Sequence, residues 1–255
     1  MSPTIFPVPS PPAPAPASTR MTDAEAFARR GSALRDFFFA TAGAALRRAF
    51  EALALPGSPP LPPVPAWDEE EYLFNRLFVG PGPVAAPPYA SVYLETERRL
   101  MGEATLFARE AYAALGLASP WQGSLPDDHI GLELDAVLAV FAALQPDAAG
   151  PADSPAPATS ATSAPSAPSA PSAPSGPGAR KPAPEDLAPW WDAFVAGHMA
   201  VWVPSFLDAL RRAGATSAVM GRAGDDLARW LADAVSMGCG AFAQPEQPVT
   251  KRGAA

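Results

Sequence analysis

Residues 34–53 read LRDFFFATAGAALRRAFEAL, and their apolar side chains recur at the spacing of an α-helix. The i, i+3, i+4 pattern is carried by Leu34, Phe37, Phe38, Ala42, Ala45, Leu46, Ala49, Phe50 and Leu53. Because Pro56-Gly57 stops a helix, the pattern predicts one amphipathic helix over about residues 22–55. Gly31-Ser32 is the point at which its first turns could separate from the rest.

The same periodicity predicts further helices along the chain. Their expected ranges are 68–78, 96–115, 126–144, 184–212 and 217–237. Gly116 is a predicted C-cap, and Ser124–Asp127 has the form of a capping box. No alternating strand pattern occurs, so the sequence predicts an all-α, single-domain bundle of about six to seven helices.

Proline is concentrated outside these helices. Residues 1–20 are predicted to be a disordered Pro/Ala-rich tail, residues 146–184 a disordered Ser/Ala/Pro linker, and residues 243–255 a second disordered tail. On this interpretation, residues 21–145 and 185–242 are two parts of one helical domain, with the linker inserted between them. Two separate domains are the alternative.

The net charge of −8 and the single cysteine, Cys239, restrict the possible functions. Acidity argues against nucleic-acid binding, but it is compatible with a basic partner segment or with solubility alone. One cysteine forms no disulfide within the chain, which fits a reducing compartment. No apolar run of membrane-spanning length is expected. Arg29-Arg30 imitates an export signal only faintly, because Asp36 interrupts the apolar stretch that follows, so we expect a cytoplasmic location.

Catalytic signatures are missing from the sequence. There is no Gly-x-Ser-x-Gly, no His-Glu-x-x-His and no dinucleotide fingerprint. His129 and Glu133 share a helix face, but His198 is the only other histidine, so a third metal ligand is lacking. The sequence therefore predicts no enzyme activity, no metal and no cofactor.

Three segments are candidates for function. The loop 80–93 holds four prolines, two glycines and two tyrosines, and is either a binding loop or a stiff crossover whose tyrosines fill the core. Asp127 and Asp128 either stabilise a helix start or meet a cationic partner. The third segment, 198–206, has a proline inside a helical pattern and aromatic residues whose simplest role is core packing.

These segments together resemble the TorD/DmsD family of redox-enzyme maturation chaperones. The resemblance is carried, over about residues 67–240, by FNRLFVGP at 74–81, PPYASVYL at 87–94, RLMGE at 99–103, PDDH at 126–129, Glu133-Leu134 and His198-x-x-x-Trp202-x-Pro204-x-Phe206. It implies an all-α bundle, as a monomer or a domain-swapped dimer. It also implies binding to the twin-arginine signal peptide of a molybdopterin oxidoreductase precursor, which is held back from export until its cofactor is inserted.

The resemblance also implies site residues. The expected peptide contacts are Phe74, Leu77, Phe78, Tyr89, Asp128 and His129, and the expected supports of the loop are Pro88, Ser91 and Tyr93. The apolar residues would line a groove for the apolar stretch of the signal peptide, and Asp128 would meet its arginines. Gly82, where some relatives carry an aromatic residue, and the long linker depart from the family pattern.

Two other functions are considered. One is an assembly factor that acts on a folded redox-enzyme subunit without recognising the signal peptide. The other is a nucleotide hydrolase, for which the sequence supplies no phosphate-binding loop.

Overall fold

The computed structural model describes residues 21–119, 121, 123–145, 184–214 and 216–238. The regular structure of these residues is helical, which confirms the predicted all-α class. The predicted tails, and all but the last residue of the predicted linker, lie outside the described residues. In chain order the helices are α1 (Asp23–Phe38), α2 (Gly43–Glu51), α3 (Trp67–Phe78), α4 (Ala90–Leu94), α5 (Glu103–Ala114), α6 (Ile130–Leu144), α7 (Pro184–Trp191), the π-helix η2 (Asp192–Met199), α8 (Ala200–Ala213) and α9 (Ala218–Gly238).

The central helix of the bundle is α1, which packs against α2, α6 and α9. Its Phe27 stacks on Trp230 of α9 with ring centroids 4.9 Å apart, and lies 4.6 Å from the ring of Phe141 of α6. One turn later, a Cβ atom at Gly31 would lie 2.7 Å from Trp230 Nε1 and 2.8 Å from Leu138. Gly31 therefore allows close helix packing in the interior of α1, and does not mark the break that its sequence position suggested.

The single helix predicted over 22–55 is two helices. The first ends at Phe38 and the second begins at Gly43. Phe39 leaves the helical conformation at φ −93° and ψ 2°, and Ala42 is extended at φ −154°. The apolar pattern runs on through this turn because Ala40 is also buried, which hides the break from periodicity.

The helix predicted over 96–115 is shorter, because α5 begins only at Glu103. The short helix α4 before it was not predicted, and the connection between the two contains Arg98 and Met101 in the left-handed region, at φ 52° and 64°. The C-cap lies one residue before the predicted Gly116, at Leu115, and Gly116 follows it in the left-handed conformation at φ 68°; the amide of Leu117 donates to the carbonyl of Tyr112.

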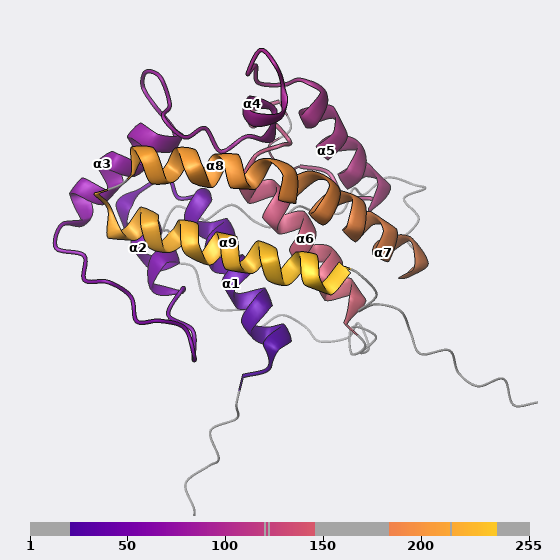
Figure 1. The fold of residues 1–255 in the computed structure, drawn as a ribbon, viewed down its shortest axis with the longest axis horizontal. Helices are drawn as coiled ribbons and strands as arrows, with labels where there is room; N and C mark the ends of the chain where they lie inside the picture. Colours follow the sequence, from indigo (N-terminus) through magenta and orange to yellow (C-terminus); the bar gives the residue numbers. More distant parts are fainter. Residues whose placement is uncertain (1–20, 120, 122, 146–183, 215, 239–255) are drawn as a thin grey trace, which may run out of the picture.

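The segments α7, η2 and α8 follow one another without interruption, and Figure 1 shows α9 lying alongside them. Within the described residues, the stretch Glu185–Ala213 is long and apolar enough to cross a membrane by length and composition alone, with a mean hydropathy of 1.4 over its most apolar 18-residue window. The uninterrupted apolar part of this stretch, residues 193–207, is bounded by Asp192 and Asp208, so the stretch passes on its average hydropathy and not as one continuous apolar run. Half of this window is buried inside the bundle, where Trp202 and Phe206 are fully covered, as is typical of a core helix.

Candidate functional site

The two loops singled out by the sequence meet in the structure. Tyr89, before α4, and His129, before α6, form an isolated antiparallel β-bridge. The amide of Ala90 donates to the carbonyl of Asp128 at 3.0 Å, and the amide of Ile130 donates to the carbonyl of Pro88 at 2.9 Å. These backbone bonds hold the Pro-rich loop against the start of α6, so the two segments form one structural unit.

Asp128 lies at the centre of this unit and is fully buried. Its Oδ2 accepts from the amide of Ser91 at 2.7 Å, and its Oδ1 accepts from the hydroxyl of Thr105 at 2.8 Å. One carboxylate thereby caps the start of α4 and binds α5. Both oxygens are therefore engaged inside the protein, and the contact of Asp128 with the arginines of a peptide at a groove mouth stays a prediction.

Asp127 connects the same unit to α5 through two further hydrogen bonds. Arg109 of α5 donates from Nε to Asp127 Oδ2 at 2.7 Å, and the hydroxyl of Tyr112 donates to the Asp127 carbonyl at 2.8 Å. Burial raises the pKa of Tyr112 well above its ordinary value, with the nearby acids adding to the effect. Tyr112 therefore acts as a neutral hydrogen-bond donor here.

His129 is the N-cap of α6, where its Nδ1 accepts from the amide of Gly131 at 3.1 Å. The capping box predicted at Ser124–Asp127 is therefore wrong, because the helix starts later, at Ile130. The imidazole stacks on Phe39 at 5.3 Å and meets the edge of Tyr89 at 5.2 Å. Burial lowers the pKa of His129 to about 3, so the ring is neutral at physiological pH.

We expect Asp128→Ala to lower the free energy of unfolding by about 2–4 kcal/mol, because it leaves the buried Ser91 amide and Thr105 hydroxyl without an acceptor. Urea denaturation measures the change. The matched control is Asp208→Ala, which removes a carboxylate with 63% side-chain exposure and should change stability by less than about 0.5 kcal/mol. Equal effects of the two substitutions would contradict the capping role.

A second buried network joins α6 to the helix that contains η2 and α8. Glu133 is fully buried; its Oε1 lies 2.7 Å from Nε2 of His198, and its Oε2 accepts from Trp202 Nε1 at 3.0 Å. Burial raises the pKa of Glu133. Burial lowers the pKa of His198, but the adjacent Glu133 outweighs this and the net shift is upward. The pair therefore retains a proton that a free histidine would release.

Sequence reasoning missed this network. The signal was an acid in the apolar stripe of 126–144, together with two ring N–H groups one turn apart at His198 and Trp202. A buried carboxylate needs donors, and these are the donors that the fold supplies. Among the described residues no group of three potential metal ligands occurs, and His129 and Glu133 each have other partners.

The predicted lining of a peptide groove is mostly core. Phe74, Leu77 and Phe78 are buried, and Phe74 and Phe78 pack edge-on against the phenylalanines of α1. The expected open groove lined by these three residues is therefore absent from the described surface, because α1 and α8 cover this face of α3. Tyr89 alone among the predicted apolar contacts is half-buried. Peptide contact by the six predicted residues stays a prediction.

The predicted loop supports have defined contacts. Pro88 and Ser91 are buried and carry the bonds to Ile130 and Asp128 described above. Tyr93 stacks on Trp202 with centroids 5.8 Å apart, and burial raises its pKa to about 12. These contacts hold the loop against the helices that it packs on. That they assist peptide binding stays a prediction.

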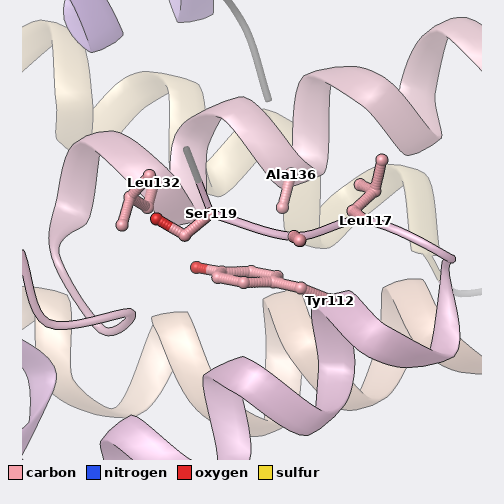
Figure 2. Close-up of a pocket in the computed structure, with 6 residues that line it drawn as sticks. Tyr112, Leu117, Ser119, Leu132 and Ala136 are labelled. Atoms are coloured by element: carbon pink, nitrogen blue, oxygen red, sulfur yellow. The ribbon is translucent and has the colours of Figure 1, made fainter. Parts of the chain in front are cut away.

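The described residues also line a small apolar pocket next to this unit. Figure 2 shows the ring of Tyr112 facing Ser119, Leu132 and Ala136 across it. Its volume is about 10 Å³, which is room for one water-sized molecule. The pocket is too small for a cofactor.

Comparisons with known proteins agree with the sequence resemblance. A family model described as nitrate reductase delta subunit matches residues 33–162. The Tat proofreading chaperone DmsD of Salmonella typhimurium is 38% identical over 58 residues, which is 23% of this chain and 28% of that protein. The probable Tat proofreading chaperone DmsD of Haemophilus influenzae is 38% identical over 61 residues, 24% of this chain and 30% of that protein. The alignments thus span less than a third of these relatives, and no solved structure matches.

Proposed function

The chain belongs to the nitrate reductase delta-subunit family and is of the TorD/DmsD type, and from this premise we propose that it is a cytoplasmic maturation chaperone, not an enzyme. Its partner is the precursor of a molybdenum-containing oxidoreductase, recognised through the twin-arginine signal peptide. Binding holds the precursor back from export while its cofactor is inserted. The chaperone itself needs no cofactor.

The observation that carries the proposal is the likeness to proteins named Tat proofreading chaperone, together with a family match that includes the joined loops of Tyr89 and His129. A signal peptide offers two arginines and an apolar stretch. The half-buried ring of Tyr89 supplies apolar contact area, and the net charge of −8 attracts the arginines. The Tyr89 ring and the negative charge act through binding alone, and no catalytic group is needed for this role.

A titration with a labelled synthetic peptide, carrying two adjacent arginines followed by an apolar stretch, tests the proposal. We expect binding that is lost when apolar residues of the peptide are changed to serine. High salt should weaken it only in part, because salt screens charges but not apolar contacts. A protein that fails to bind the peptide would contradict the proposal.

The alternative is an assembly factor that acts on a folded redox-enzyme subunit. The family description, which names a subunit of nitrate reductase, favours testing it. The same titration with a catalytic subunit that lacks its signal peptide separates the two functions. Binding to that subunit, without binding to the isolated peptide, would support the alternative.

A further inference from the structure

Exposed apolar side chains gather around α4, α5 and the beginning of α8. We call this set the Phe107 surface, and it consists of Leu94, Leu100, Met101, Leu106, Phe107 and Val201. Met101 is 63% exposed and Leu106 is 53% exposed. The other large apolar side chains that are exposed among the described residues, Tyr72 and Val79, belong to α3 and its C-cap. When exposed apolar side chains form a contiguous patch on a soluble protein, the patch commonly marks an interaction site.

Contacts below the surface bring its parts together. The ring of Phe107 lies 4.9 Å from the ring of His198 and stacks on Phe194 at 6.1 Å, which joins α5 to η2. Val201 stands three residues after His198, at the beginning of α8, and is 57% exposed. The packing of α4 against both α5 and α8 adds the third part, and Figure 1 shows α4 and α5 next to each other above α8.

The connection from α4 to α5 holds its apolar residues in water at an energetic cost. Met101 has φ 64° and Arg98 has φ 52°, a region that side-chain-bearing residues seldom adopt. A carboxylate oxygen of Glu95 accepts from the amide of Ala104, which closes this connection. The fold thus keeps Leu100 and Met101 at the surface although neither gains burial there.

Charge at the Phe107 surface suits a cationic partner. Glu103 and Glu110 stand one turn before and one turn after Phe107, both are exposed, and neither forms an ion pair with any described residue. Three arginines also lie at or near this surface: Arg109 pairs with Asp127, Arg99 pairs with Glu97, and Arg98 in the α4–α5 connection is close to Tyr93. The apolar face of α5 is therefore flanked by two unneutralised carboxylates.

We propose that the Phe107 surface binds the apolar stretch of an arginine-bearing signal peptide as a helix, with Glu103 and Glu110 meeting the guanidinium groups. The proposal rests on the proposed function and gives it a location. When a helix lies on an apolar surface, its own apolar side chains and those of the surface bury one another. An acidic flank adds attraction to arginine and orients the helix. The location differs from the predicted groove, whose phenylalanines are inside the core.

The test uses the full chain and the labelled twin-arginine peptide described above. The variant Met101→Ser with Leu106→Ser should weaken binding by about tenfold or more, since two exposed anchors lose their apolar contact. The control Tyr72→Ser changes a side chain that is 71% exposed on α3 and should leave binding unchanged. Unchanged thermal unfolding of each variant shows that the fold is retained.

A second variant, Glu103→Gln with Glu110→Gln, tests the charges. It should weaken binding by about threefold to tenfold at low salt and have little effect at high salt. If the native chain binds and the serine variant binds equally well, or if Tyr72→Ser weakens binding as much, the Phe107 surface is not the site and the proposed function survives. If the native chain does not bind the peptide, the proposed function itself fails.

Discussion

Replacing Glu133 with alanine should lower the free energy of unfolding by about 3–5 kcal/mol, the range for removing one partner of a buried ion pair. Glu133 has no exposed surface, and it is the shared acceptor for the ring nitrogens of His198 and Trp202. Alanine would strand both donors inside the protein and open a cavity between α6 and α8. Urea denaturation at neutral pH measures the loss.

Glu133→Gln is the matched control for charge. Its carbonyl oxygen can accept from Trp202 and its amide can donate to a neutral His198, so both hydrogen bonds persist. We expect this variant to lose less than half of what alanine loses. A glutamine variant as unstable as the alanine variant would show that the ionic charge, and not the hydrogen bonding, stabilises the network. Glu97→Ala, at a side chain that is 67% exposed, should have almost no effect.

The helical architecture follows from local sequence, because an apolar stripe that recurs every three or four residues requires one buried face. This is why α3, α6 and α9 lie close to their predicted ranges. The turn at 39–42 escaped prediction because Phe39 and Ala40 continue the apolar pattern while the backbone leaves the helix. Periodicity reports which side chains are covered, and it does not report the direction of the chain that carries them.

The site depends on contacts between distant parts of the sequence. Asp128 reaches Ser91 and Thr105, which are 37 and 23 residues away, and Glu133 reaches His198 across 65 residues. The family resemblance found these positions but assigned Phe74 and Asp128 to a surface, whereas the structure buries both. A motif identifies residues that act together, and only the packing shows whether they face a ligand or one another.

Acid should destabilise the protein through His129. The pKa of this histidine is about 3 in the folded protein, compared with 6.5 for an unperturbed one, because burial disfavours its charged form. Below pH 6.5 the unfolded chain binds a proton that the folded protein refuses. Above pH 6.5 neither state carries this proton, so the free energy of unfolding is not reduced by it. As the pH falls from 6.5 toward 3, protonation of the unfolded chain lowers the free energy of unfolding progressively. Each pKa unit corresponds to about 1.4 kcal/mol, so the total reaches about 4–5 kcal/mol.

The comparison with His129→Asn isolates this contribution from other acid-sensitive groups. Asparagine is a good N-cap, whose oxygen can accept from the amide of Gly131, and it does not titrate. Between about pH 5.5 and pH 4, the free energy of unfolding of the native chain should fall faster than that of the variant by about 1.4 kcal/mol per pH unit, the slope for one proton. His198, whose pKa is raised, contributes stability that is lost only as the pH rises above 6.5, so it does not mask the effect. Parallel curves for the two proteins would mean that His129 takes up its proton in the fold, and that its cap on α6 is not the acceptor bond that the structure shows.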